Sequence, residues 1–194
     1  MGRDVARIRV VAAAVVALVG AGVAGGAREA WAETKVAKVE AGMPAPDFRA
    51  PASTGGTIGL SDLKGKVVVL YFYPKDDTPG CTAEAKGFRD LADDFGKAGA
   101  VVLGVSRDGL ESHAKFAKKH GLTFALLADA DGRIHDVFGA WKEGSIFGRS
   151  PLGVDRSTFV IDGEGLVRKA WHGVDPDDHA ARVLDFVRSL APAR

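Results

Sequence analysis

Cysteine is nearly absent from this chain, which holds one cysteine among 194 residues. A single cysteine cannot form an internal disulfide, a cysteine-rich zinc site or a CxxC redox pair. An excess of charge is missing too, because 26 Lys and Arg stand against 25 Asp and Glu, a formal net charge of +1. Such a balance lacks the basic excess typical of nucleic-acid binding. The composition therefore excludes disulfide scaffolds and predicts no nucleic-acid partner.

Motifs for metals and nucleotides are also missing. The five histidines show no HExxH-type spacing, so we predict no metal site. No GxGxxG follows a predicted strand, so we predict no nucleotide cofactor. His113 and His120 fall on one face of a predicted helix, and we interpret that face as solvent-exposed.

The first 32 residues differ from the rest of the chain. Arg3, Arg7 and Arg9 precede an uncharged run of mostly Ala, Val, Gly and Leu at residues 10–27, and Ala-Trp-Ala follows at 30–32. A basic start, an apolar run and a small-x-small site are the parts of a secretory signal peptide. The alternative is a retained anchor, although the run is at the lower edge of the length that crosses about 30 Å of hydrocarbon.

The predicted organisation is a signal peptide over residues 1–32 and one domain over residues 33–194. We expect export to the periplasm, or membrane attachment facing the periplasm if the first segment is retained. An unpaired cysteine in that oxidising compartment is a candidate for a reactive thiol or for an intermolecular disulfide.

Predicted strands and helices alternate along the domain. Apolar runs rich in β-branched residues predict buried strands, and apolar residues at helical spacing predict amphipathic helices. Asp108 and Glu111 have the spacing of a capping box. The alternation indicates a three-layer α/β fold with a parallel centre, and a closing hairpin makes the sheet mixed. The predicted elements are a hairpin within 42–65, strands at 67–73, 100–105, 123–127, 157–161 and 166–171, helices at 81–97, 108–120 and 178–190, and a short helix or turn at 131–138.

The lone cysteine stands shortly after the first predicted strand. Thr78 and Pro79 predict a helix start, with Thr78 as the N-cap residue and Pro79 as the first helical residue. Cys81 then lies in the first turn, where unpaired N–H groups and the helix dipole favour a thiolate, so we predict a pKa below about 8.5. The alternative is an inert core cysteine, which we would expect on the apolar stripe that carries Phe88.

The surroundings of Cys81 resemble the active-site motif of the peroxiredoxins. The apolar run 67–73 is followed by PxxxTxxC at residues 74–81, and the string YFYPKDDTPGCTAEA is similar to the Q-type subfamily, also called bacterioferritin comigratory proteins. Further similar stretches extend the resemblance over roughly residues 42–190. It implies a thioredoxin-like three-layer sandwich with a central mixed sheet.

The resemblance also implies roles for five side chains. Cys81 would be the peroxidatic cysteine, whose thiolate attacks a peroxide oxygen, and Arg156 would stabilise the thiolate and polarise the O–O bond. Thr78 would hydrogen-bond both partners, Pro74 would shield the pocket from water, and Glu84 would support the site from behind. The alternatives are a helix cap for Thr78, a strand end for Pro74, a surface ion pair for Arg156 and an exposed helix position for Glu84.

One position departs from the subfamily. Many Q-type members carry a second cysteine on the same helix, at the position that Lys86 occupies here. A sulfenic acid on Cys81 must then be reduced by an external thiol or by Cys81 of another chain, and until then it is exposed to overoxidation. We expect a thioredoxin-like, glutaredoxin-like or small-thiol reductant and a monomer or weak dimer.

The predicted function is a thiol-dependent peroxidase that reduces hydrogen peroxide and organic hydroperoxides. Two alternatives remain. The first is a thioredoxin-like disulfide exchanger or redox chaperone, which the missing CxxC disfavours. The second is a non-catalytic module with an intermolecular disulfide. The Gly-rich loop 141–153 carries apolar residues that line either the pocket mouth or a partner surface.

Overall fold

The computed structural model describes residues 38–142 and 153–190. The predicted signal peptide at 1–32 and most of the loop 141–153 lie outside the described residues. Within the described ranges, no helix has both the length and the hydropathy of a membrane span.

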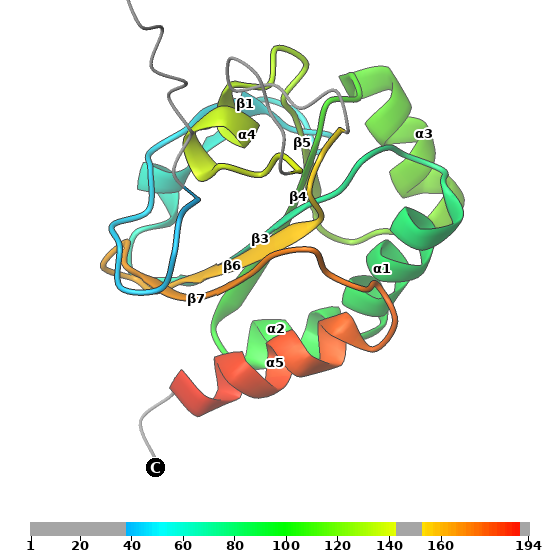
Figure 1. Ribbon diagram of the computed structural model, residues 1–194. Helices are drawn as coiled ribbons and strands as arrows, with labels where there is room; N and C mark the ends of the chain where they lie inside the picture. Colours follow the sequence, from blue (N-terminus) through cyan, green and yellow to red (C-terminus); the bar gives the residue numbers. More distant parts are fainter. Residues whose placement is uncertain (1–37, 143–152, 191–194) are drawn as a thin grey trace, which may run out of the picture. The chain divides into compact units, whose positions relative to one another are not determined.

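A five-stranded mixed sheet forms the centre of the domain (Figure 1). Its parallel part confirms the predicted parallel centre, and its last two strands run antiparallel and confirm the mixed sheet. In spatial order the strands are β5 (Ala125–Ala128), β4 (Ala100–Ser106), β3 (Val67–Phe72), β6 (Ser157–Ile161) and β7 (Val167–Trp171).

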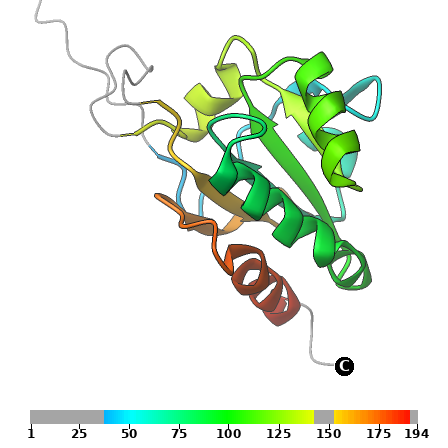
Figure 2. The same ribbon diagram turned by 90° about the vertical axis from the view of Figure 1, so that its right-hand side faces the viewer.

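Two hydrophobic clusters cover the two faces of the sheet and make three layers. Along β3, Val69 and Tyr71 point into one cluster, while Leu70 and Phe72 point into the other, which explains the unbroken apolar run. Figures 1 and 2 show the covering elements. The cluster with Val69 and Tyr71 lies under four helices: α1 (Pro79–Asp90), α2 (Ala92–Lys97), α3 (Leu110–His120) and α5 (His179–Leu190). The cluster with Leu70 and Phe72 lies under α4 (Arg133–Phe138), the short 3-10 helix η1 (Leu60–Leu63) and the hairpin of β1 (Arg49–Pro51) and β2 (Thr57–Gly59).

Three local predictions were wrong. The predicted helix 81–97 is broken at Leu91, whose φ of −106° and ψ of 8° separate α1 from α2. The N-cap of α3 is Gly109 rather than Asp108, because the Asp108 carboxylate is already hydrogen-bonded to the Ser106 hydroxyl. His113 is fully buried rather than solvent-exposed.

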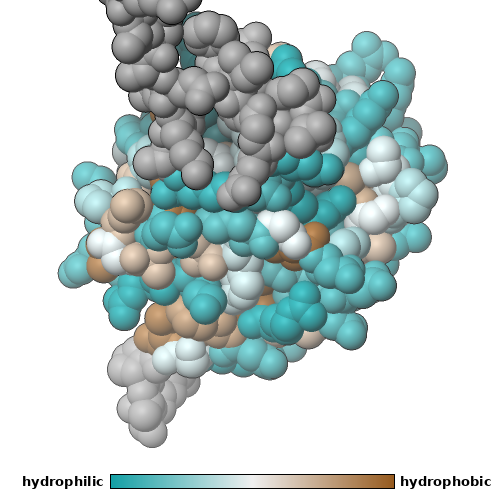
Figure 3. Space-filling view, viewed as in Figure 1, coloured by the Kyte–Doolittle hydropathy of each residue, from teal (hydrophilic) through white to brown (hydrophobic). Residues whose placement is uncertain are grey.

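One face of the domain is mostly polar. Hydrophilic residues predominate on the face in Figure 3, with apolar residues scattered among them. Among the described residues, the large apolar side chains that are exposed are Met43, Leu110 and Val137. Single exposed apolar residues are ordinary on a soluble domain, so the chemistry has to be sought where the strands end.

Candidate active site

The central strand β3 leads directly into the candidate site. It pairs with β4 on one side and with β6 on the other, so its end is fixed from both sides. The chain leaves the sheet after Phe72 and enters α1 at Pro79. In α/β sheets, sites form beyond the carboxyl ends of strands, and the loop 73–78 together with the first turn of α1 occupies that place.

Cys81 lies in the first turn of α1, as predicted. Thr78 is the N-cap residue in extended conformation, and Pro79 begins the helix. The Thr78 carbonyl accepts the first helical hydrogen bond from Thr82 N at 2.9 Å. Cys81 is 1% exposed, so its sulfur sits in a nearly dry place next to the unpaired N–H groups of the helix start.

Arg156 reaches Cys81 from the opposite side of the site. β6 runs antiparallel to β3 with Ser157 opposite Phe72, so the preceding Arg156 extends past the edge where β3 ends. Its Nη2 donates to the Cys81 Sγ at 3.4 Å. Its Nη1 donates to the Glu84 carboxylate, one turn farther along α1. The structure therefore joins three predicted site residues, Cys81, Glu84 and Arg156, into one hydrogen-bonded group.

The group contains one cation and two acids. The Glu84 side chain is fully buried, and burial raises its pKa to about 7 although the charge of Arg156 opposes the shift. Burial works to lower the pKa of Arg156, but the Glu84 carboxylate and the hydrogen bond to Cys81 outweigh it and raise that pKa. Arg156 therefore stays charged and donates to both the sulfur and the carboxylate.

Two polar atoms beside the group have no hydrogen-bond partner among the described residues. They are Oε1 of Glu84 and the hydroxyl of Tyr71, both buried. Burial first, and then the charges of Glu84 and Cys81, raise the pKa of Tyr71, so its hydroxyl stays protonated. Unpartnered buried polar atoms are uncommon in folded proteins, and here both belong to the surroundings of the reactive sulfur.

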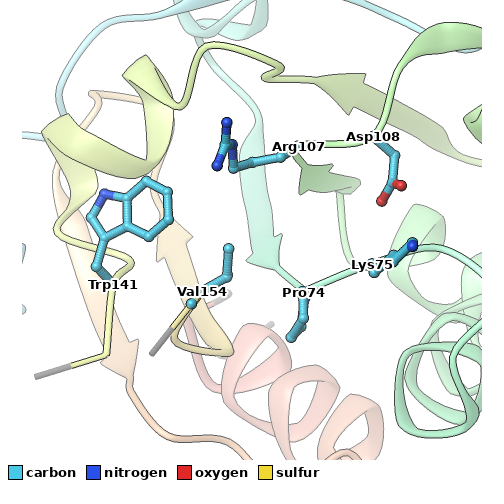
Figure 4. A pocket seen from close by; sticks show the side chains of 7 residues that line it. Pro74, Lys75, Arg107, Asp108, Trp141 and Val154 are labelled. Atoms are coloured by element: carbon cyan, nitrogen blue, oxygen red, sulfur yellow. The ribbon is translucent and has the colours of Figure 1, made fainter. Parts of the chain in front are cut away.

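Thr78 and Pro74 are close to Cys81 along the chain, and each makes other contacts in the structure. The Thr78 hydroxyl donates to the Lys75 carbonyl at 3.1 Å, and no side-chain hydrogen bond caps the helix. Pro74 lines a cavity of about 320 Å³ with Lys75, Arg107, Asp108, Trp141, Gly153 and Val154 (Figure 4).

That cavity combines basic and aromatic side chains. Figure 4 shows Trp141 and Arg107 at one end of it and Lys75 beside Asp108 at the other. The Arg107 guanidinium lies 5.9 Å from the centre of the Trp141 ring. Of the loop 141–153, predicted to line either a pocket mouth or a partner surface, only Trp141, Lys142 and Gly153 are described, and Trp141 and Gly153 line this cavity.

A buried polar cluster behind the loop was not predicted from the sequence. It centres on Asp76, which hydrogen-bonds Tyr73, Ser112 and His113. The only local signal is a carboxylate placed directly after a buried strand. Its partners on α3 lie far along the chain, so no spacing pattern connects them with Asp76.

Comparisons with known proteins agree with this geometry. Residues 41–170 match the AhpC/TSA family. Peroxiredoxin Bcp of Bacillus subtilis is 46% identical over 153 residues, which cover 79% of this chain and 98% of that protein. A putative peroxiredoxin bcp of Coxiella burnetii is 47% identical over 146 residues, which cover 75% of this chain and 97% of that protein. A structure of Xanthomonas campestris peroxiredoxin Q has a TM-score of 0.69 at 42% identity and covers 73% of this chain and 90% of that chain.

The chain therefore belongs to the AhpC/TSA family, the class that the sheet and the cysteine at the helix start already indicate. Within it the chain is a peroxiredoxin of the Bcp or Q type, a thiol-dependent peroxidase with a thioredoxin-like fold. Its single cysteine makes it a one-cysteine variant. These findings favour the peroxidase over the disulfide exchanger and the non-catalytic module.

Proposed function

We propose that Cys81 is the peroxidatic residue and that the protein reduces hydrogen peroxide and organic hydroperoxides with electrons from an external thiol. One observation carries this proposal: the guanidinium of Arg156 donates to the sulfur of the chain's single cysteine, which is buried at a helix start. A structure of the Xanthomonas campestris bacterioferritin comigratory protein, 40% identical to this chain, is described in terms of alkyl peroxide reduction, which supports the organic substrates.

The oxidative step is a displacement at oxygen. The Cys81 thiolate attacks the terminal peroxide oxygen, an S–O bond forms, and the O–O bond breaks. Sulfur loses two electrons and becomes a sulfenic acid, while the leaving oxygen takes a proton and departs as water or an alcohol. Arg156 is placed to stabilise the anionic sulfur, and a fixed donor near developing charge lowers such a barrier.

Thr78 and Pro74 complete the proposed pocket. The hydroxyl of Thr78 donates to Lys75 in the structure, and we expect it to turn toward a bound peroxide and donate to an oxygen. A hydroxyl rotates at little cost, and its oxygen can still accept a hydrogen bond. The ring of Pro74 presents no N–H group, which suits a wall that excludes water from the sulfur.

The reductive step requires a second molecule. A thiolate of the reductant attacks the Cys81 sulfur, an S–S bond forms, and the sulfenic oxygen leaves as water. A second thiol then releases a disulfide and restores the Cys81 thiolate. Lys86, at the position where many Q-type members carry a cysteine, is exposed on α1 and offers no thiol. Candidate reductants are thioredoxin-like proteins, glutaredoxin-like proteins and small thiols.

Peroxide consumption with different thiol donors tests this proposal. We expect turnover by the chain without residues 1–32 in the presence of at least one donor class, and none by Cys81→Ser. Reduction of insulin disulfides should be absent. Insulin reduction without peroxide consumption would contradict the proposal and favour the disulfide exchanger.

We also infer that the protein is exported, as the basic, apolar and small-residue order of its first segment suggests. Expression with a periplasmic fraction assay tests this inference. We expect soluble periplasmic protein that begins after Ala32. Protein of full length in the membrane fraction would instead support an anchor, and full-length protein in the cytoplasm would contradict export.

A further inference from the structure

Two consecutive carboxylates of the loop 73–78 are bonded to the same helix. Asp76 is bonded to the first turn of α3, and Asp77 is bonded to its last turn. The loop passes beside α3 on its way from β3 to α1 (Figure 1). Both carboxylates directly precede Thr78, so α3 holds the segment from which the proposed catalytic helix starts.

The Asp76 carboxylate has all its partners inside the protein. It is 6% exposed. Oδ1 accepts from the Tyr73 hydroxyl at 2.7 Å, and Oδ2 accepts from the Ser112 hydroxyl at 2.7 Å. The Nδ1 of His113 lies 2.9 Å from Oδ2. The backbone N–H of Asp76 donates to Asp108 at 2.9 Å, so both the side chain and the main chain of this residue are fixed.

His113 has an acceptor oxygen beside each of its ring nitrogens. Its Nε2 lies 3.2 Å from the carbonyl oxygen of Leu127, which can only accept a hydrogen bond. Its Nδ1 faces a carboxylate that already accepts from two hydroxyl groups. Both ring nitrogens therefore face acceptor oxygens inside the protein, and the ring is fully buried. Hydrogen bonds from His113, Ser112 and Tyr73 keep the pKa of Asp76 below its usual range against the opposing effect of burial.

Asp77 adds a second attachment under backbone strain. Its φ of +58° is unusual for a residue with a Cβ. Its Oδ1 accepts from Lys119 Nζ at 2.8 Å and from His120 Nε2 at 3.0 Å. These contacts hold the loop in a conformation that an isolated chain would rarely adopt.

We propose that Asp76 and His113 are positioning residues for the peroxide step, because their buried, hydrogen-bonded pair fixes the loop that leads from Pro74 through Thr78 to Cys81. This inference rests on the proposed function. A buried His–carboxylate pair is weak evidence for stability, since apolar residues of similar size often replace such a pair without loss. Here the Asp76 carboxylate bonds Tyr73 within the loop and Ser112 and His113 on α3, and His113 in turn contacts Leu127 of β5, which indicates a role in orientation.

The molecule contains a matched control. His135 and Asp129 form a second buried His–carboxylate pair at 2.6 Å. His135 lies on α4, over the other face of the sheet, and its ring packs against Phe72 and Trp141. Within the described part of the chain, this pair makes no hydrogen bond to the loop 73–78. Loss of this pair should weaken the fold without releasing the reacting loop.

The test measures the oxidation and the reduction of Cys81 separately in three variants: His113→Gln, Asp76→Asn and the control His135→Gln. Trapping of Cys81 sulfenic acid with dimedone gives the oxidation rate by hydrogen peroxide, and dithiothreitol gives the reduction rate. We expect oxidation to slow by about 10- to 100-fold in the first two variants, the range seen when supporting side chains are lost. Reduction in those variants, and both rates in His135→Gln, should stay within about threefold of the wild type even if its thermal midpoint falls.

Each result decides the inference. Equal oxidation rates in the wild type and in the two loop variants would overturn it, as would an equal loss in His135→Gln. If the buried variants do not fold, Asp77→Gly replaces them, because glycine adopts a positive φ freely and the side chain lies at the surface. Oxidation at least about threefold slower supports the inference, and an unchanged rate contradicts it. A wild-type chain that peroxide does not oxidise at Cys81 would instead refute the proposed function.

Discussion

The guanidinium of Arg156 is the charged group that contacts the sulfur of Cys81. Arg156 donates to Cys81 through one nitrogen and to Glu84 through another. Only arginine offers several rigidly spaced donors from one permanent cation. The side chain therefore contacts the sulfur and at the same time satisfies a buried acid behind it.

Replacement of Arg156 by methionine should slow the oxidation of Cys81 by peroxide about 10²- to 10³-fold, as loss of one fixed donor does in other enzymes. Arg156→Lys should recover only part of the rate, because one ammonium cannot reproduce the fork. Arg168→Met is the matched control, since Arg168 pairs with Asp162 in a solvent-exposed bridge. A similar loss in both methionine variants would argue against a direct contact with the reacting atoms.

Glu84 predicts a pH dependence of stability. Its pKa is raised from 4.5 to about 7 by burial, so the folded state binds its proton more tightly than the unfolded chain does. The contribution of the protonated group is fully present below pH 4.5 and is lost as pH rises to about 7. The free energy of unfolding of Glu84→Gln relative to the wild type should therefore rise by roughly 3 kcal/mol over this interval. Denaturant titrations of both proteins from acid to neutral pH measure it, and a constant difference would mean that folding does not raise the pKa of Glu84.

The ring of Tyr71 packs between the sheet and α1. Tyr71 of β3 stacks on Phe88 of α1 with ring centres 4.7 Å apart, and on the sheet it lies opposite Gly104 of β4. A Cβ at Gly104 would lie 2.8 Å from the Tyr71 ring and from Leu126. The absence of a side chain at Gly104 therefore sets how closely the helix with Cys81 approaches the strands.

Gly104→Ala should lower the free energy of unfolding by about 1–3 kcal/mol, the usual cost of an overpacked core. Gly96→Ala in α2 is the control, because no atom lies within 4 Å of the added Cβ. It should be neutral or stabilising by up to about 1 kcal/mol through helix propensity. Thermal or denaturant unfolding of both variants checks this, and equal stability would show that the Tyr71 ring moves away without cost.

The regular elements could be predicted because their signals are local. The apolar run before Pro74 predicts β3, which is buried on both faces, and Gly121 ends α3 in the left-handed conformation that glycine favours. The break at Leu91 could not be predicted, because it leaves the apolar spacing of α1 and α2 intact. Likewise, the burial of His113 depends on Asp76, a partner far along the chain, so composition and spacing contain no sign of it.

The whole molecule combines the common architecture of its family with a single thiol, whereas many Q-type members have two. The fold brings Arg156, which directly precedes β6, to Cys81 on α1, a contact between residues far apart along the chain. The resemblance to peroxiredoxins predicted this pair, whereas periodicity alone did not. Because the chain contains one cysteine, the catalytic cycle cannot close within one molecule, and the protein is expected to depend on a reductant from its surroundings.

The intact mass of the reduced protein after one equivalent of hydrogen peroxide is the most direct test of the central claim. We predict the gain of one oxygen atom on Cys81, its capture as a single dimedone adduct, and its disappearance after treatment with a thiol. Cys81→Ser should gain neither the oxygen nor the adduct. An unmodified wild-type protein, or an adduct on any other residue, would contradict the account.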